Sequence, residues 1–289
     1  MNRAAAVPPI RERRIQLGSI STRVLSVQGP GPSLLLLHGY TDSADTWRPV
    51  MELLATRGRR AIAIDLPHHG RAGRLSKPAT LAGFDGFLAA ALRYADHGDG
   101  VVVIGNSLGA LLAVRAAHTP THGLLGVLAL APPGDVIHPV LRALPTIGPA
   151  LARALTVVPI PDRVLDAVTG HVVLRVCTNA AVSAATRRAY TAPLDRRRLA
   201  ELLLVGAEVI PELGPRSSVR DAAIPLTLWW GSRDKVCPVR GAEHYADTGH
   251  TVITRGAPHC PQLTDPHLVL SLLNAHEQRI AQLAETDAK

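Results

Sequence analysis

Aromatic side chains are scarce in this sequence, at 3% of 289 residues, with only two phenylalanines. A core must therefore be built from alanine, leucine, valine and isoleucine, and a substrate pocket is expected to be lined mainly by aliphatic side chains. Modules that bind single-stranded nucleic acid stack bases on aromatic rings, so the composition argues against that class of protein. We expect no nucleic-acid partner.

Lysine is almost absent too. The only lysines are Lys77, Lys235 and Lys289, so the net charge of +8 is carried almost entirely by arginine. The arginines are scattered, and their densest runs lie within residues 11–14 and 196–198. This distribution is typical of a solvated basic surface. The alternative is an interaction protein whose basic surface binds an anionic partner.

Disulfide frameworks and long apolar runs are also lacking. The three cysteines cannot all pair, and the apolar run at residues 4–10 is broken by two prolines, unlike a signal peptide. A cytoplasmic location is therefore expected. The longest apolar stretch, residues 140–160, includes Arg142 and Arg153, so we expect no stable membrane insertion.

What the sequence does contain is an alternation of short apolar runs and helical stretches. Hydrophobic residues make up 47% and charged residues 19%, which favours a globular core over disorder. Strands are predicted at residues 15–20, 21–27, 33–37, 61–64, 101–104, 125–131, 226–230 and 251–254. Helices are predicted at residues 44–56, 80–94, 107–117, 240–246 and 266–284. This pattern indicates an α/β protein with a mostly parallel twisted sheet flanked by helices.

The alternation stops after residue 131. Residues 135–218 contain helical segments punctuated by proline and no clear strand pattern, which is far longer than an ordinary connection. We predict that they form a helical cap, or lid, inserted after the sixth strand. Residues 1–134 and 219–289 are then expected to form one core.

One cap helix is predicted to start at Gly148 and Pro149, a pair typical of a helix N-terminus. Leu151 and Leu155 share the apolar face of this helix. We therefore predict that both leucines bind substrate. The alternative is a helix packed wholly onto the core.

A nucleophile elbow is predicted where a strand meets a helix. Gly105, Ser107 and Gly109 form the pattern G-x-S-x-G between an apolar strand and a helical run. The turn is so tight that the residues two before and two after the serine must be nearly free of side chains. Ser107 is therefore the predicted nucleophile.

A serine nucleophile needs an imidazole to take its proton and a carboxylate to orient that imidazole. Asp234 and His259 each follow a predicted strand, so both are expected at the edge of the sheet where Ser107 emerges. The order Ser, Asp, His along the chain is that of the α/β-hydrolase architecture. Asp135, which also follows a predicted strand, is the alternative acid.

Together these motifs resemble the α/β-hydrolase superfamily over essentially the whole chain, in its serine hydrolase branch with a helical cap, to which esterases and lipases belong. Residues 36–40, Leu-Leu-His-Gly-Tyr, resemble the His-Gly loop of that family. The resemblance implies an oxyanion hole formed by the backbone amides of Tyr40 and Leu108, which would stabilise a tetrahedral intermediate. We expect no cofactor and no metal.

One loop departs from the family pattern. The family often has Asp-x-Pro-Gly-x-Gly where residues 65–70 read Asp-Leu-Pro-His-His-Gly, so His68 stands where glycine is usual. We predict that His68 and His69 are histidines of a surface loop. A metal site would need further ligands that the sequence does not place. Cys237 and Cys260, close to the predicted acid and base, are predicted to be packing residues.

The predicted activity is hydrolysis of a carboxylic ester with an apolar acyl or alcohol part, through an acyl-enzyme on Ser107. A serine at the elbow argues against the dehalogenase and epoxide hydrolase branches, which have aspartate there. Carbon–carbon bond hydrolysis, lactone opening and cofactor-free perhydrolysis stay open, as does a catalytically weak ligand receptor of this fold. The expected partner is a small apolar ester, and the oligomeric state is left open.

Overall fold

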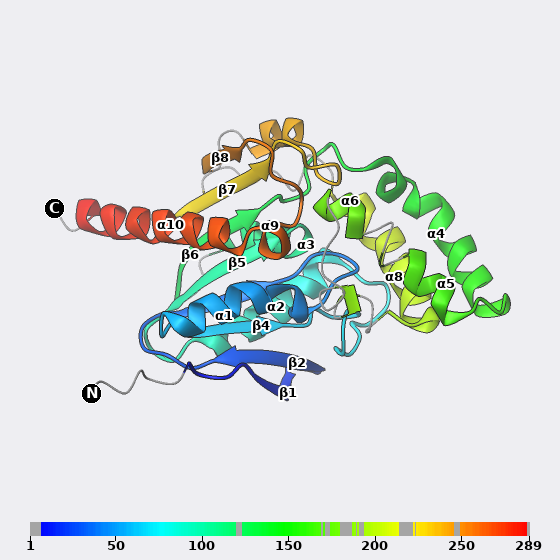
Figure 1. Cartoon of the computed structure of the whole chain (residues 1–289), viewed down its shortest axis with the longest axis horizontal. Coiled ribbons are helices and arrows are strands. Elements are labelled where there is room, and N and C mark those ends of the chain that lie inside the picture. The colour runs from blue at the N-terminus through cyan, green and yellow to red at the C-terminus, as the bar shows by residue number, and fades with distance from the viewer. Residues whose placement is uncertain are drawn as a thin grey trace.

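The computed structural model describes residues 7–119, 123–168, 170, 174–179, 187–188, 190, 194–213, 222, 224–245 and 249–287. Its centre is an eight-stranded sheet with the order β1-β2-β4-β3-β5-β6-β7-β8 (Figure 1). The strands are β1 (Arg11–Leu17), β2 (Ile20–Val27), β3 (Ser33–Leu37), β4 (Ala61–Ile64), β5 (Val101–Asn106), β6 (Leu124–Leu130), β7 (Leu226–Gly231) and β8 (His250–Thr254). Each corresponds to a predicted strand: β3 and β4 have the predicted ends, and the other strands have shifted ends.

The sheet is mostly parallel, as predicted. Strand β1 pairs with β2, and β2 with β4, in the antiparallel sense, whereas every other neighbouring pair is parallel. Every residue of the central strands β3 and β5 is buried. Strands covered on both faces need apolar side chains on both faces, which explains their continuous apolar sequence.

Helices cover the two faces of the sheet (Figure 1). The helices of the core are η1 (Ala44–Trp47), α1 (Arg48–Thr56), α2 (Leu81–Ala95), α3 (Leu108–Ala117), η5 (Val239–Tyr245), α9 (Pro261–Thr264) and α10 (Pro266–Asp287). Trp47, Met51 and Leu270 pack from η1, α1 and α10 onto one face. Phe84 and Leu111 pack from α2 and α3 onto the other. This layering holds the carboxyl ends of the parallel strands in fixed positions.

A helical cap follows the sixth strand, as predicted, and completes the predicted α/β-hydrolase fold. Between β6 and β7 the structure has α4 (Pro139–Val157), α5 (Asp162–Ala167), α6 (Leu174–Thr178), α8 (Arg196–Val209) and η3 (Ile210–Glu212). In Figure 1 these helices lie together at the right, beyond one end of the sheet. No helix in the described part of the chain is both long and apolar enough to cross a membrane.

The start of the first cap helix differs from the prediction. Helix α4 begins at Pro139, and Gly148 and Pro149 lie inside it. A Cβ atom on Gly148 would lie 2.7 Å from the carbonyl oxygen of Leu203 in α8, so this glycine lets the two helices approach closely. Gly148 therefore serves helix packing and does not mark a helix start.

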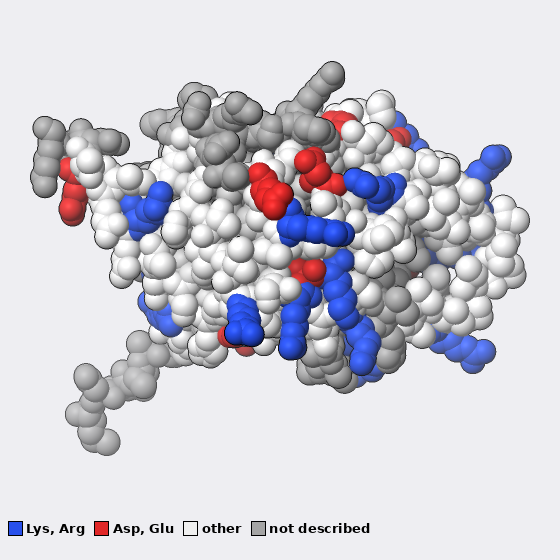
Figure 2. Space-filling view, turned by 90° about the horizontal axis from the view of Figure 1, so that it is seen from above, with Lys and Arg blue, Asp and Glu red and all other residues white. Residues whose placement is uncertain are grey.

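Charged side chains are spread over the molecule. In the view of Figure 2, cationic side chains extend from the middle of the face to the cap end at the right, with acidic side chains among them. This dispersed pattern agrees with the scattered positions of the arginines in the sequence.

Candidate active site

Ser107 lies in a strained turn between β5 and α3. Its backbone φ is 53° and its ψ is −116°, in the left-handed region that residues with side chains rarely adopt. A Cβ atom on Gly105 would lie 2.2 Å from the carbonyl oxygen of Gly109, and one on Gly109 would lie 2.4 Å from that of Leu37. Only glycine fits at either place, so the structure has the elbow geometry that the sequence predicts.

His259 and Asp234 are hydrogen-bonded to each other. The distance from Nδ1 of His259 to Oδ2 of Asp234 is 2.7 Å, and both side chains are buried. The other carboxylate oxygen accepts hydrogen bonds of 2.8 Å from the backbone amides of Val236 and Cys237. Because the carboxylate is held on both oxygens, it fixes the plane of the imidazole and leaves Nε2 as the free ring nitrogen.

The charge of Asp234 also affects the acidity of the histidine. Burial lowers the pKa of His259, but the neighbouring carboxylate raises it, and the net shift is upward. The alternative acid, Asp135, has a half-exposed side chain and lies 3.2 Å from Nδ1 of His244. The structure therefore pairs His259 with Asp234.

Asn106, next to the predicted nucleophile, links the elbow to the loop that contains His259. Its Nδ2 donates a hydrogen bond of 3.0 Å to the carbonyl oxygen of His259. Its Oδ1 accepts one of 3.1 Å from the side chain of Gln262. Neither residue was predicted from the sequence, although an amide at the end of an apolar strand is a usable signal.

The predicted oxyanion donors lie beside the nucleophile. Tyr40 and Leu108 line a small pocket together with Ser107. A Cβ atom on Gly39 would lie 3.2 Å from Cβ of Ser107, so the His-Gly loop runs directly against the elbow. This proximity is what a pair of backbone N–H donors would require.

A neutral histidine holds the His-Gly loop in place. His38 is fully buried, and burial lowers its pKa to about 4. Its Nδ1 donates to the carbonyl oxygen of Gly39 at 2.8 Å, and its Nε2 accepts from the amide of Leu66 at 2.9 Å. A neutral ring with one donor and one acceptor nitrogen satisfies both hydrogen bonds.

An apolar cavity of about 270 Å³ opens above Ser107 and His259. Helices α4 and α8 of the cap provide its aliphatic wall, through Leu141, Leu144, Leu199, Leu202 and Leu203. The cap therefore lines the predicted site with aliphatic side chains.

The two leucines predicted to bind substrate lie elsewhere. Leu151 is 45% exposed to solvent, and Leu155 is buried in a separate cluster with Leu165 and Ala200. Neither lines the cavity above Ser107. The prediction for Leu151 and Leu155 is therefore wrong. Helix α4 starts earlier than the sequence indicated, and its first turns, with Leu141 and Leu144, line the cavity instead.

One end of the cavity is polar. Thr41 and Tyr190 contact each other through their hydroxyls at 3.2 Å, and Asp42 and Cys177 lie on the same wall. Burial raises the pKa of Asp42 to about 8, although the amide of Ser43 donates to its carboxylate at 2.7 Å. None of these residues was singled out from the sequence.

All three cysteines lie close to the site. Cys237 and Cys260 are buried, consistent with their predicted packing role. Cys237 lines the same small pocket as Ser107, and burial raises the pKa of this thiol. Cys260 contacts Cys177 of the cap through a backbone hydrogen bond of 3.2 Å.

His68 and His69 lie in the loop whose sequence differs from the family pattern. Both are buried, contrary to the prediction that they lie at the surface. His68 is 2% exposed and His69 is fully buried. Nδ1 of His69 donates to the carbonyl oxygen of Pro67 at 2.8 Å. Within the described residues, no three side chains of histidine, cysteine, aspartate or glutamate gather as a metal site would require.

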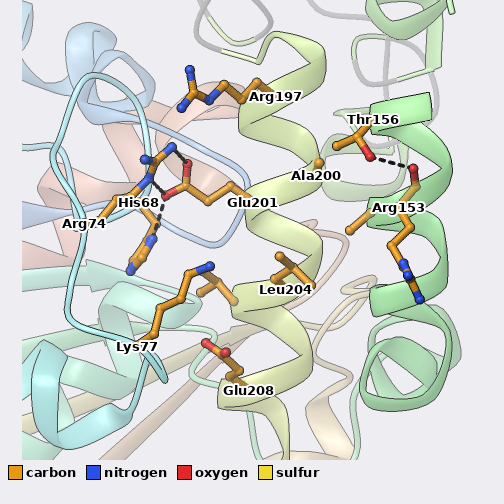
Figure 3. A pocket seen from close by; sticks show the side chains of 12 residues that line it. His68, Arg74, Lys77, Arg153, Thr156, Arg197, Ala200, Glu201, Leu204 and Glu208 are labelled. Carbon is orange, nitrogen blue, oxygen red and sulfur yellow. Dashed lines mark hydrogen bonds and ion pairs between the residues drawn. The ribbon is translucent and has the colours of Figure 1, made fainter. Parts of the chain in front are cut away.

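His68 joins the core to the cap, which explains its burial. Its Nδ1 lies 2.8 Å from a carboxylate oxygen of Glu201 in α8, and Arg74 binds both oxygens of that carboxylate at 2.6 and 2.8 Å (Figure 3). Arg198 donates to the carbonyl oxygen of His68 at 3.0 Å. His68, Arg74 and Glu201 line a groove of about 320 Å³ between α4, α8 and the loop that includes Lys77. We call this groove the cap–core groove.

A parallel sheet with a serine elbow, an acid and a histidine after successive strands, beneath a helical cap, defines the class of α/β-hydrolase fold proteins. A family model described as "Alpha/beta hydrolase family" matches residues 34–272. The chain therefore belongs to the alpha/beta hydrolase family.

Comparisons with individual proteins agree with this family. An uncharacterized protein of Mycobacterium tuberculosis (strain H37Rv) is 30% identical over 268 residues, which cover 84% of this chain and 74% of the relative. An alpha/beta hydrolase fold protein from Burkholderia ambifaria is similar in structure, with a TM-score of 0.74, 18% identity, and 91% of this chain and 99% of that chain covered. A 2-hydroxy-6-oxo-6-phenylhexa-2,4-dienoate hydrolase from Rhodococcus sp. strain RHA1 has a TM-score of 0.69 and 20% identity, and the match covers 94% of this chain and 99% of that chain. At such identities the structural likeness shows the fold.

Proposed function

We propose that this protein is a serine hydrolase that cleaves a carboxylic ester with an apolar acyl or alcohol part through an acyl-enzyme on Ser107. The observation that carries the proposal is the hydrogen bond of 2.7 Å between Asp234 and His259, next to an elbow serine at the floor of an aliphatic cavity. A buried imidazole held by a carboxylate is suited to take the proton of a serine hydroxyl.

The first half of the proposed reaction forms the acyl-enzyme. Nε2 of His259 removes the proton of the Ser107 hydroxyl as Oγ attacks the ester carbonyl. The amides of Tyr40 and Leu108 donate to the oxyanion, and one such donor is typically worth about 3 kcal/mol. The imidazolium, stabilised by Asp234, then gives its proton to the leaving alcohol.

The second half releases the acid. A water molecule gives a proton to His259 as its oxygen attacks the acyl carbonyl, and the same donors stabilise the second oxyanion. Ser107 regains its proton when the acyl group leaves as a carboxylic acid. Each of these steps uses side chains, backbone amides and water, and none calls for a cofactor.

The test combines turnover with labelling. We expect the protein to hydrolyse p-nitrophenyl esters of short and medium acyl chains, and a fluorophosphonate to label only the peptide that carries Ser107. Ser107→Ala should lose both properties. An adduct on another serine, or labelling that survives the substitution, would refute the assignment. Labelling of Ser107 without ester turnover would redirect the proposal to the carbon–carbon, lactone or perhydrolase chemistries.

A further inference from the structure

Two cysteines meet where the cap contacts the loop that carries the catalytic histidine. Cys177 lies in α6 of the cap, and Cys260 directly follows His259. The backbone amide of Cys260 donates a hydrogen bond of 3.2 Å to the carbonyl oxygen of Cys177, while the thiol of Cys260 donates to Oδ1 of Asn106 at 3.7 Å. Each of the two thiols shifts the pKa of the other, so these residues, far apart in the sequence, are close neighbours.

The spacing of the two backbones suits a disulfide. A hydrogen bond between one residue's amide and the other's carbonyl holds the two Cα atoms within about 6.5 Å. Disulfides form when Cα atoms lie about 4.4 to 6.8 Å apart and the side chains face each other. The backbones are already close enough, so closing the bond requires the thiol of Cys260 to turn from Oδ1 of Asn106 toward Cys177.

A small reagent can reach this pair. Both cysteines line the cavity above Ser107, and Cys177 is only partly buried. The neighbouring Cys260 thiol and the charge of His259 lower the pKa of Cys177 in spite of its burial, which favours the reactive thiolate. The third cysteine, Cys237, does not line this cavity, and burial raises the pKa of its thiol.

We propose that Cys177 and Cys260 are an oxidation site, and that a small dialkyl disulfide entering the cavity converts them into a reversible disulfide joining the cap to the histidine loop. This proposal does not rest on the reaction proposed above, because it concerns the thiols alone.

The exchange proceeds in two balanced steps. The thiolate of Cys177 attacks one sulfur of the reagent, so that a mixed disulfide forms and one alkyl thiolate leaves. The sulfur of Cys260 then attacks the Cys177 sulfur and releases the second thiolate. The protein loses two electrons and two protons, the reagent's disulfide is reduced, and the protons pass to the two released thiolates.

The cross-link would change how the cavity opens. It ties α6 to the loop that positions His259, so the cap can no longer move away from the core at this place. Substrate entry should therefore slow, while the unfolded chain, now closed into a long loop, loses conformational freedom and the melting temperature rises.

The test uses bis(2-hydroxyethyl) disulfide, a dialkyl disulfide small enough for the cavity. After incubation, we expect the intact protein to lose the mass of two hydrogens without an adduct of the reagent, and peptide mapping to find Cys177 joined to Cys260. A dithiol reductant should restore the original mass. A persistent adduct of the reagent, a bond that includes Cys237, or two thiols that stay reduced would each overturn the proposal.

Matched variants identify the pair. Cys177→Ser and Cys260→Ser should each abolish the two-hydrogen loss, whereas Cys237→Ser should retain it. Cys177→Ser is the primary test, because its half-buried site tolerates a change better than the buried Cys260. If Cys177→Ser still forms an intramolecular disulfide, the assignment is wrong.

The effect on the cap is read by hydrogen exchange. Oxidation of the native protein should slow exchange in α6 and raise the melting temperature, and the same treatment of Cys177→Ser should change neither. Equal protection with and without the cross-link would show that the bond does not restrain the cap. Since mass and exchange do not depend on turnover, a protein that hydrolyses no ester would leave this test intact.

Discussion

The hydrogen bond between Asp234 and His259 controls both the tautomer and the acidity of the imidazole. In Asp234→Asn the amide has no charge to stabilise the imidazolium and can favour the wrong tautomer. We expect kcat to fall by about 10⁴-fold with the fold intact. The measurement is kcat on a p-nitrophenyl ester, with circular dichroism as the check on folding.

Asp135→Asn is the matched control for this change. Because Asp135 lies against His244, its loss should leave kcat close to that of the native protein. If Asp135→Asn were inactive while Asp234→Asn stayed active, the role of acid would move to the loop after β6.

The pH dependence of the rate follows from the raised pKa of His259. The imidazole accepts a proton only when neutral, so the rate should rise with pH, with its midpoint above the value of about 6.5 for an ordinary histidine. Replacing Asp234 removes the main cause of the upward shift, so the residual activity should have its midpoint at lower pH. A rate that does not change between about pH 5 and 8 would contradict a histidine base.

Asp42 should make stability depend on pH. Its pKa of about 8 in the folded protein lies above the value of about 3.9 for an unfolded chain. The folded state therefore binds the extra proton, and this contribution to stability is full below the unfolded value and is lost as the pH rises through about 8. Asp42→Asn stays neutral, so its melting temperature should exceed that of the native protein increasingly as the pH rises from 6 to about 9. Parallel melting curves would show that Asp42 is ionised in the folded state.

Glu201 holds helix α8 of the cap against the core. Burial opposes its ionisation, but hydrogen bonds from His68 and Arg74 lower its pKa to about 2, so its contribution to stability is full above about pH 4.3 and is lost only as the pH falls toward 2. At neutral pH, Glu201→Gln should destabilise the protein by about 1 to 2 kcal/mol, a modest value because Arg74 is half exposed.

Hydrogen exchange distinguishes a cap effect from general destabilisation. Glu201→Gln should exchange faster in α8 than in the central strands. Glu52→Gln makes the same chemical change at an exposed position of α1 and should alter neither exchange nor melting temperature. If both variants behave alike, the contacts in Figure 3 do not anchor the cap.

The aliphatic wall contributed by α4 should set the acyl chain length. Each buried methylene is worth about 0.8 kcal/mol, so kcat/KM should rise from acetate toward longer esters until the cavity is full. Leu141→Trp fills part of the cavity and should shift the preference to shorter chains. Leu151→Trp lies on the solvent side of the same helix and should leave the profile unchanged. A flat native series, or equal shifts in both variants, would contradict an apolar acyl site.

Across the molecule, the elbow and the strands could be predicted from the sequence because each depends on the residues immediately around it. The elbow at Ser107 needs glycine on both sides because backbone atoms lie within van der Waals distance there. The strands need continuous apolar runs because both faces are covered. Such requirements leave a visible pattern within a few residues, and the positions of Asp234 and His259 then follow from the order of the strands.

The features that sequence predicted poorly depend on contacts between distant segments. Gly148, followed by Pro149, has the sequence pattern of a helix start, but the glycine is needed because Leu203 of another helix lies against it. His68 looks like a surface residue until α8 brings Glu201 against it. Which face of α4 lines the cavity is decided by how the cap packs, and no local period of the sequence encodes that.

The scarcity of lysine makes the cap–core groove accessible to a fluorescent reporter without mutagenesis. Lys77 is exposed and lines this groove, while Lys235 is exposed on the acid loop and Lys289 lies outside the described residues. An amine-reactive dye therefore has few places to attach besides the N-terminal amine. A dye on Lys77 would sit beside α8, where its brightness and polarisation would follow displacement of the cap in real time, during substrate turnover or during thiol oxidation.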